Sequence, residues 1–294
     1  MKLDNNTKIL IIGLGVIGGS YAEALTRAGY EVSCITLDEE DIKYALAKGI
    51  IKYGTTELDE GLIKESSLII FALYPTVFIE WIEKNQSLFS PGTLITDVTG
   101  VKSTVVDRVQ SILREDVEFI SAHPMAGREQ SGVAFSNAEV FRGANYIVIP
   151  TEKNTPEAIE TCKTLGRILG FSKISELSAE EHDKMIAHLS QLTHCIAVTL
   201  MNCNSKEGLE KYTGDSFRDL TRIAKINDRM WSELFLMNKN ALIREMDMFI
   251  KEFTEFRNLI ENENVDKMRE KMRESTSRRA RFDKPKIAKD DKAL

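Results

Sequence analysis

Cysteine is scarce in this sequence, and long apolar runs are missing. Only 4 of its 294 residues are cysteines, and they form no Cys-x-x-Cys pair. Scattered cysteines are typical of small buried side chains in a reducing compartment, and not of a disulfide scaffold or a metal site. No run approaches the roughly 20 apolar residues that cross a bilayer, and the first residues lack the apolar core of a secretion signal. We therefore expect a cytoplasmic protein without a membrane span.

The charge of the chain gives no reason to expect a nucleic acid or a membrane as partner. Lys and Arg number 39 against 45 Asp and Glu, which gives a formal net charge of −6. The residues after Val265 are rich in Lys and Arg, most densely at 278–281. The solvated end of a helix explains such a run better than a binding arm does. The expected partner is a small molecule.

The most informative segment is an apolar run followed by closely spaced glycines. Residues 8–12 are strand-like, and Gly13, Gly15 and Gly18 follow in a Gly-x-Gly-x-x-Gly pattern ahead of an amphipathic segment at 21–28. In a strand–turn–helix unit these glycines permit the turn, the approach of a diphosphate and close packing of helix on strand. A dinucleotide is therefore the predicted cofactor. The residues predicted to bind it are Gly13, Gly15, Val16, Ile17, Gly18, Thr36 and Asp38.

The end of the second predicted strand bears on the kind of dinucleotide. An acid at this end would bind the adenosine ribose 2′-hydroxyl of NAD, but the position falls at Thr36, with Asp38 two residues later. No Lys or Arg follows before Lys43 to bind the 2′-phosphate of NADP, and the acidic run at 38–41 would repel that phosphate. NAD is therefore favoured, and NADP stays open.

The chain changes character near residue 177. Before it, strand-like runs alternate with helical patterns, which predicts a doubly wound, mostly parallel α/β sheet of the Rossmann type. The expected strands are 8–12, 31–36, 68–72, 94–98, 118–121, 145–149 and 172–175, with helices such as 78–85, 101–113 and 156–169 between them. From Ser178, which opens a capping box with Glu181, only helical patterns follow, at 216–224, 230–261 and 265–273. We expect a dinucleotide-binding domain at 1–177 and an all-α substrate-binding and dimerisation domain at 178–294.

Four histidines are candidates for acid–base chemistry. His123 follows a predicted strand at the carboxyl edge where α/β sheets bind ligands, and a pKa near neutrality suits a general base. His182, His188 and His194 fall in the helical part, at spacings that do not share one helix face and so do not form a His-x-x-x-His metal site. By spacing alone, each of these three is interpreted as a helix residue with an ordinary hydrogen bond.

Taken together, several motifs resemble those of prephenate and arogenate dehydrogenases. They occur in the family's order over nearly the whole chain, from residue 8 to residue 262. The motifs are 13–20 (GLGVIGGS), 96–102 (TDVTGVK), 121–127 (SAHPMAG) with Glu129 and Gly132, 145–150 (NYIVIP), 181–183 (EHD), 189–194 (LSQLTH), 217–224 (FRDLTRIA) and 230–231 (MW). The resemblance implies the NAD-dependent oxidative decarboxylation of prephenate to 4-hydroxyphenylpyruvate in tyrosine biosynthesis, by a minimal, monofunctional form of the enzyme.

The same resemblance implies roles for individual residues. His123 matches the catalytic histidine that accepts the proton of the ring hydroxyl, and His194 matches a second histidine, a donor that contacts substrate from the helical domain. Arg222 matches an arginine that binds a substrate carboxylate, which suits the fork of a guanidinium. By spacing alone, an ion pair between Arg222 and Asp219 explains this arginine equally well. Asp219, Asp215 and Glu129 are candidates to face the substrate side chain.

The sequence departs from the family pattern beside the expected site. Many members carry a serine after Asp-Val-Gly that helps to orient the reacting hydroxyl. Here Gly100 holds that place and Thr99 precedes it. Thr99 is therefore the candidate to replace this serine in catalysis.

A second substrate and two other functions stay open. Arogenate carries an ammonium group where prephenate has a keto group, and prephenate is favoured because it is the commoner substrate of such minimal forms. Another NAD(P)-dependent dehydrogenase or reductase, such as a 3-hydroxyacid dehydrogenase, would share the architecture, but its lysine-based scheme has no role for His123. A non-catalytic cofactor sensor would be favoured only if His123 and Arg222 proved dispensable.

The helical pattern at 230–261 is richer in apolar residues than packing on one small domain requires. Its apolar residues are Trp231, Leu234, Phe235, Leu242, Met246, Phe249, Ile250, Phe253 and Phe256. The alternatives are an internal core helix and an interface between two copies of the chain. A homodimer with two-fold symmetry is favoured, because family members are dimers.

Overall fold

The computed structural model describes residues 2–4, 6–127, 130 and 132–283. The chain divides into two compact units, Met1–Leu242 and Ile243–Leu294. The first unit contains both sheets and every residue of the candidate site described below. The predicted domain boundary after residue 177 lies inside this first unit and stays a prediction.

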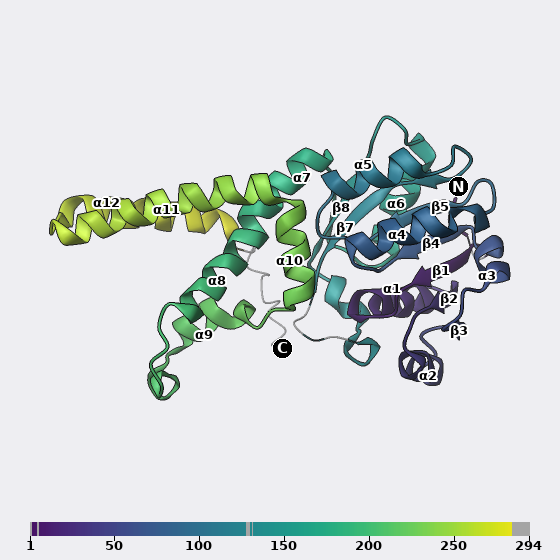
Figure 1. Cartoon of the computed structure of the whole chain (residues 1–294), viewed down its shortest axis with the longest axis horizontal. Helices are drawn as coiled ribbons and strands as arrows, with labels where there is room; N and C mark the ends of the chain where they lie inside the picture. Colours follow the sequence, from purple (N-terminus) through teal and green to yellow (C-terminus); the bar gives the residue numbers. More distant parts are fainter. Residues whose placement is uncertain (1, 5, 128–129, 131, 284–294) are drawn as a thin grey trace, which may run out of the picture. The chain divides into compact units, whose positions relative to one another are not determined.

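A six-stranded parallel sheet forms the centre of the first unit (Figure 1). Its strands are β1 (Lys8–Ile12), β2 (Glu31–Ile35), β3 (Tyr53–Thr55), β4 (Leu68–Phe71), β5 (Leu94–Asp97) and β6 (Glu118–Phe119). They run in the order β3-β2-β1-β4-β5-β6. This order places a switch point between β1 and β4, where doubly wound sheets bind dinucleotides. The predicted Rossmann-like fold is confirmed, although the short edge strand β3 has no counterpart among the predicted strands.

Helices cover both faces of this sheet because successive residues of each strand point to opposite sides. Ile9 and Ile11 of β1 pack in one buried cluster with residues of α1, α2 and α6, whereas Leu10 and Ile12 pack in a second with residues of α3, α4 and α5. The helices are α1 (Val16–Arg27), α2 (Glu39–Ala47), α3 (Glu60–Glu65), α4 (Pro75–Asn85), α5 (Ser103–Ile112) and α6 (Pro156–Ile168), with short η1 (Gln86–Leu88), η2 (Val133–Phe135) and η3 (Ala138–Phe141).

The other strands form a separate three-stranded sheet, in the order β7-β8-β9. They are β7 (Ser121–Met125), β8 (Asn145–Ile149) and β9 (Lys173–Glu176), with β7 antiparallel to β8 and β8 parallel to β9. The predicted strand at 118–121 was therefore wrong in its extent, because β6 ends at Phe119 and a new strand begins at Ser121. His123 accordingly lies inside a strand, paired with Ile147, and does not follow a strand end as predicted.

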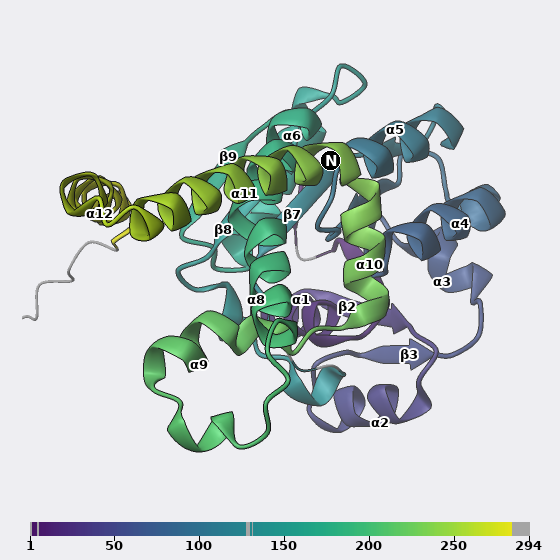
Figure 2. The same ribbon diagram turned by 60° about the vertical axis from the view of Figure 1, so that its left-hand side comes forward.

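Helices follow from Ser178, whose side chain and Glu181 form the predicted capping box. They are α7 (Ala179–Ile186), the π-helical turn η4 (Ala187–Gln191), α8 (Leu192–Asn202), η5 (Leu209–Tyr212), α9 (Asp215–Thr221), η6 (Arg222–Ala224), α10 (Asp228–Met237), α11 (Lys239–Glu261), α12 (Val265–Arg279) and η7 (Ala280–Phe282). Figure 2 shows α8 and α9 side by side, and η6 also packs on α8.

The predicted helix at 230–261 is wrong in one respect, because it breaks at Asn238 between α10 and α11. The buried Asn238 amide nitrogen donates to the carbonyl oxygen of Asp183 and to Oε1 of Gln191, at 2.8 Å each. Gln191 in turn donates to the carbonyl oxygen of Leu234 at 2.9 Å. These hydrogen bonds tie the break to α7 and η4, which the periodicity of one segment does not reveal.

The second unit comprises most of α11 together with α12. Lys271 of α12 forms ion pairs with Glu252 and Glu255 of α11, at 2.8 and 3.2 Å. Large apolar side chains of α11, among them Ile250 and Phe253, are exposed. Within the described part of the chain, no helix has the length and apolar character needed to cross a membrane.

Candidate active site

The glycine loop after β1 has the geometry of a diphosphate-binding turn. Gly13 has a φ of +96°, and a Cβ at this position would lie 2.5 Å from the carbonyl oxygen of Ala72. A Cβ on Gly18 would overlap the carbonyl oxygen of Gly13, whereas a Cβ on Gly15 meets no described atom within 4 Å. No side chain of the described residues caps the start of α1. The loop therefore offers open space and free backbone N–H groups to an anion.

The other predicted cofactor residues lie at the same edge of the sheet. Val16 and Ile17 begin α1, and Thr36 follows directly after β2 with its hydroxyl 3.4 Å from the backbone nitrogen of Leu14. Asp38 caps α2, because its carboxylate accepts from the backbone nitrogens of Glu40 and Asp41 at 2.9 and 3.4 Å. The partly exposed Thr36 and the exposed Asp38 thus stand at the carboxyl end of β2, where a Rossmann fold binds the adenosine ribose.

A fully buried ion pair lies at the carboxyl end of β5. The ammonium group of Lys102 is 2.9 Å from Oδ2 of Asp97, and both side chains have no exposed surface. The same ammonium donates to the carbonyl oxygen of Ala122 at 2.7 Å and to the Thr99 hydroxyl at 3.2 Å. The Thr99 hydroxyl itself donates to Asp97, and the Ser121 hydroxyl donates to the other oxygen of that carboxylate. These contacts join the end of β5 to the start of β7, the strand that carries His123.

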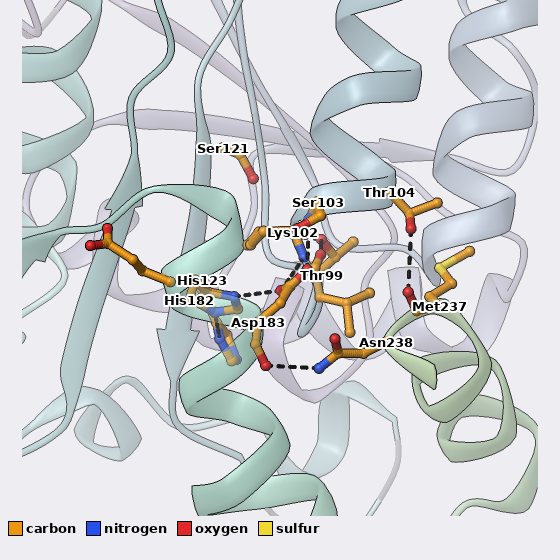
Figure 3. Close-up of polar contacts among 12 residues, drawn as sticks. Thr99, Lys102, Ser103, Thr104, Ser121, His123, His182, Asp183, Met237 and Asn238 are labelled. Carbon is orange, nitrogen blue, oxygen red and sulfur yellow. Dashed lines mark hydrogen bonds and ion pairs between the residues drawn. The ribbon is translucent and has the colours of Figure 1, made fainter. Parts of the chain in front are cut away.

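His123 is the first of three side chains that are hydrogen-bonded in a row (Figure 3). Its Nδ1 atom is 2.8 Å from Nε2 of His182, and Nδ1 of His182 is 2.8 Å from Oδ1 of Asp183. The Asp183 carboxylate also accepts from the backbone nitrogens of Lys102 and Ser103, at 2.8 Å each. This row of hydrogen-bonded side chains therefore joins β7, through α7, to the start of α5.

Burial and charge determine the protonation of these groups. Burial, with the nearby charges of His182 and Lys102, holds the pKa of His123 well below its ordinary value. Burial also lowers the pKa of His182, although Asp183 opposes this shift, and it lowers the pKa of Lys102 against the opposing effect of Asp97. Burial alone would raise the pKa of Asp183, but hydrogen bonds from His182 and Ser103 outweigh it and hold that pKa below its ordinary value. His123 is consequently a neutral imidazole at neutral pH.

The second nitrogen of His123, Nε2, lies beside Gly100. A Cβ built on Gly100 would lie 4.0 Å from Nε2 of His123 and 3.6 Å from a methyl group of Leu234 in α10. The His123 ring is only partly buried, in contrast to the fully buried His182 ring. Nε2 is thus the nitrogen of His123 that can meet a ligand, next to a residue without a side chain.

The structure places His194 on α8, with its ring stacked on Trp231 of α10 at a centroid distance of 3.6 Å. Its Nδ1 atom lies 2.8 Å from the carbonyl oxygen of Ser190. A carbonyl oxygen only accepts, so Nδ1 carries the hydrogen and Nε2 of the neutral ring is an acceptor. Burial lowers the pKa of His194, which favours this neutral form.

The remaining predicted site residues lie in the helical part or outside the described residues. Arg222 is the first residue of η6, which packs on α8, and Asp219 lies in α9. Both side chains are exposed. Glu129 lies outside the described residues. The structure therefore brings His123 and Thr99 into one connected cluster, whereas Arg222 and Asp219 lie beside the helix that carries His194.

Lys102, His182 and Asp183 belong to the site but were not predicted as site residues. Lys102 and the His182–Asp183 pair occur in motifs at 96–102 and 181–183, but their contacts join segments about 80 residues apart. One signal was available, since a lysine two residues after a strand-end Asp-Val-Thr-Gly can fold back onto the aspartate. The link from His123 to His182 had no signal in the spacing of histidines.

Comparison with known proteins gives a consistent family. Residues 21–170 match the model described as "Prephenate dehydrogenase, nucleotide-binding domain", and residues 178–274 match "Prephenate dehydrogenase, dimerization domain". The chain is 31% identical over 267 residues to prephenate dehydrogenase of Bacillus subtilis, which covers 88% of this chain and 72% of that protein. It is 33% identical over 255 residues to the Lactococcus lactis enzyme of the same name, and this match covers 84% of this chain and 70% of that protein.

Solved structures agree with the sequence comparison. Prephenate dehydrogenase from Aquifex aeolicus, crystallised in complex with hydroxyphenyl propionate and NAD⁺, superimposes with a TM-score of 0.86 and 29% sequence identity. The match covers 94% of this chain and 98% of that chain. The similarity therefore extends over both the sheet-containing and the helical parts.

Proposed function

The chain belongs to the prephenate dehydrogenase family, and we propose that it oxidises prephenate with NAD⁺ and releases carbon dioxide to form 4-hydroxyphenylpyruvate. The observation that carries this proposal is the environment of His123. Its neutral ring directs Nε2 toward Gly100, which follows β5, and β5 is separated from β1 and its glycine loop only by β4. A dinucleotide whose adenosine lies at the end of β2 would extend across the carboxyl ends of the strands and bring its nicotinamide toward β5. A base beside Gly100 is therefore close to the expected nicotinamide position.

The reaction requires a proton acceptor, a hydride acceptor and a leaving carboxylate. His123 Nε2 accepts the proton of the ring hydroxyl. NAD⁺, when bound, would accept the hydride from the ring carbon that carries this hydroxyl. The ring carboxylate then leaves as carbon dioxide, and its bonding electrons complete the aromatic ring. Gly100 has no side chain that would compete with substrate beside His123 Nε2, so the hydroxyl can approach the base directly.

Thr99 has a supporting part in this proposal. Its hydroxyl is already engaged with Asp97 and Lys102, and its side chain is buried. We propose that Thr99 helps to hold the buried ion pair under His123 and does not itself orient the reacting hydroxyl. Among the described residues on the β5–β7 side, His123 is then the proposed partner of that hydroxyl.

NAD⁺ is the proposed cofactor. The open space at Gly15 and the uncapped start of α1 suit a diphosphate, and the A. aeolicus relative was crystallised with NAD⁺. The exposed carboxylates of Asp38 and Glu39 follow the ribose-binding end of β2 and would repel a 2′-phosphate. Thr36 and Asp38 are the proposed ribose contacts.

The acid side of the pH profile should reveal the low pKa of His123. Protonation of Nε2 removes the base, so activity is lost as pH falls through the His123 pKa. Because this pKa lies well below the ordinary value of 6.5, kcat/KM for prephenate should stay level through pH 6.5 and decline only in a more acidic range. Enzyme held at each acidic pH and returned to neutral pH for assay controls for denaturation. An acid limb at or above pH 6.5 would contradict the assignment.

Arg222 is the proposed ligand of a substrate carboxylate. His194, on the neighbouring α8, is a proposed second contact to substrate, made by its acceptor Nε2 with a donor group and not with the carboxylate, in contrast to the donor role that the resemblance implies. Replacing Arg222 by alanine should raise KM for prephenate about 10- to 100-fold, the value of one or two hydrogen bonds to a charged group. Arg222→Lys should recover only part of this loss, because an ammonium lacks the planar fork. Arg218→Ala, an exposed arginine of the preceding helix that pairs with Asp215, is the matched control and should change KM less than about twofold.

Asp219, Asp215 and Glu129 are the candidates to face the substrate side chain, and the choice between prephenate and arogenate depends on whether one of them does. An acidic group there would favour the ammonium of arogenate, and a keto acid has no such requirement. The choice between the two substrates is tested by kcat/KM for prephenate and for arogenate, each with NAD⁺ and with NADP⁺. We expect turnover of prephenate with NAD⁺ to exceed the other three pairings. A preference for arogenate would replace the substrate, and no turnover in any pairing would favour a related reductase or a non-catalytic cofactor sensor.

A homodimer is the proposed assembly. The match to a dimerisation domain spans 178–274, and Ile250 and Phe253 of α11 are 56% and 67% exposed. Phe253→Glu should convert the dimer to a monomer at micromolar concentration, as measured by sedimentation velocity, because it places a charge in an apolar interface. Lys251→Glu, an exposed site on the same helix, is the control and should remain dimeric. A dimer that persists in the double variant Ile250→Glu/Phe253→Glu would exclude this face as the interface.

A further inference from the structure

We propose that His182 and Asp183 are positioning residues that fix His123 in the tautomer with a free Nε2, and that they do so from the helical part of the chain. The inference rests on the proposed role of His123 as base. It adds two residues that have no contact with substrate in the proposal, and it assigns each hydrogen in the chain of side chains.

The assignment begins at the Asp183 carboxylate. One oxygen accepts from the backbone nitrogen of Lys102 and the other from that of Ser103, at 2.8 Å each. Two backbone donors at the start of α5 stabilise the ionised form of the carboxylate. An ionised carboxylate can only accept hydrogen bonds, so Nδ1 of His182, 2.8 Å from Oδ1, must be the donor.

The direction then propagates to His123. A neutral His182 with hydrogen on Nδ1 has a lone pair on Nε2, which lies 2.8 Å from Nδ1 of His123. His123 must therefore donate from Nδ1, and its Nε2 atom carries no hydrogen. The opposite tautomer would place two lone pairs against each other between the rings and would leave Nε2 of His123 unable to accept a proton.

The charges around His182 favour its neutral state. Burial lowers the pKa of both histidines, and the nearby ammonium group of Lys102 lowers these pKa values further. Asp97 and Asp183 act in the opposite sense on His182 without reversing the shift. When His123 takes a proton, its positive charge is hydrogen-bonded through His182 to the Asp183 carboxylate, which supplies the compensating charge.

The chain of side chains also links the base to the packing of the helices (Figure 3). His123 lies on β7, whereas His182 and Asp183 lie on α7, and the Asp183 carboxylate supplies the first-turn hydrogen bonds of α5. In the described structure, the N-cap residue of α5, Lys102, provides no side-chain cap of its own. The Asp183 carbonyl is held in turn by Asn238 at the break between α10 and α11. The tautomer of His123 thus depends on correct docking of α7 against α5.

The test is the side-chain ¹⁵N spectrum of His123 in the whole enzyme, free of substrate. With only four histidines in the sequence, single-histidine variants assign each signal. At neutral pH, wild type should show a protonated, pyrrole-type Nδ1 and an unprotonated, pyridine-type Nε2 for His123. His182→Phe should shift His123 toward the Nε2-protonated form, whereas His182→Gln, whose amide can accept from His123 and donate to Asp183, should preserve the wild-type pattern.

Kinetics provide the second readout. His182→Phe should lower kcat for prephenate by about 10²- to 10³-fold with KM changed less than about threefold, since a wrong tautomer in the serine protease triad costs about 10⁴. His182→Gln should recover most of this loss, and His188→Gln, at an exposed position on η4, should match wild type.

The two readouts separate this inference from the proposed function. A wild-type spectrum with protonated Nε2 on His123, or an unchanged spectrum in His182→Phe, would overturn the inference whatever the substrate is. Equal kcat values for His182→Phe and His188→Gln would also overturn it. If His182→Phe does not fold, the wild-type spectrum together with His182→Gln decides the matter. The predicted tautomer in an enzyme that leaves prephenate unchanged would support the inference and contradict the proposed reaction.

Discussion

His123→Asn is expected to lower kcat for prephenate by about 10³- to 10⁴-fold, the upper part of the roughly 10²- to 10⁴-fold range that a positioned general base contributes to catalysis. An asparagine keeps a side chain of similar reach at β7 and can still donate to His182, but its amide cannot take the proton of the ring hydroxyl. Stopped and continuous assays of NADH formation measure the effect. NAD⁺ affinity, measured by calorimetry, should change less than about threefold, because the glycine loop follows β1 and not β7.

The matched control for this variant is His188→Asn. His188 is exposed on η4 and is not one of the three side chains that link His123 to Asp183, so its replacement should leave kcat at the wild-type value. An asparagine variant at position 123 that retains more than about a tenth of wild-type kcat would exclude His123 as general base, since even weak base catalysis contributes about 10²-fold.

Lys102→Met is expected to lower the free energy of unfolding by about 3 to 5 kcal/mol, the usual result of removing one partner from a buried ion pair. The Asp97 carboxylate would remain without any exposed surface and without its cation, and the carbonyl oxygen of Ala122 would lose its donor. Because the free energy of unfolding of an ordinary domain is about 5 to 15 kcal/mol, this loss is a large fraction of it. Urea unfolding monitored by circular dichroism measures it.

The double variant Asp97→Asn/Lys102→Met separates charge from packing. It removes the uncompensated charge and retains hydrogen-bonding groups for Thr99 and Ser121, so it should be more stable than Lys102→Met alone. Lys64→Met, in an exposed ion pair with Glu60, should change the free energy of unfolding by less than about 1 kcal/mol. A Lys102→Met variant no less stable than Lys64→Met would show that the pair does not hold the β5–β7 junction.

The parts of the fold that could be predicted from sequence have local causes. The continuous apolar run of β1 and the three glycines after it specify a strand, a turn and a helix within one short segment. All three form, although the helix begins at Val16, earlier than the predicted segment at 21–28. The capping box at Ser178 likewise depends on residues three apart. Fold class, family and reaction type were accordingly within reach of the sequence.

The errors have non-local causes. The strand that carries His123 exists because it pairs with β8, more than 20 residues later, and no pattern at 121–125 announces a partner in a separate sheet. The break at Asn238 exists because its amide bonds to Asp183 and Gln191 on other helices. The catalytic role of Thr99 stays a prediction, and only the fold shows that its hydroxyl lies beside Asp97 and Lys102.

The central claim is that His123 takes the proton during an oxidative decarboxylation. Its most direct test is the stoichiometry of a single turnover, with NADH measured by absorbance and carbon dioxide by isotope release from prephenate labelled in the ring carboxylate. Wild type should release one carbon dioxide for each NADH formed, and His123→Asn with bound NAD⁺ should form neither at a comparable rate. NADH without carbon dioxide, or wild-type rates of both in His123→Asn, would contradict the account.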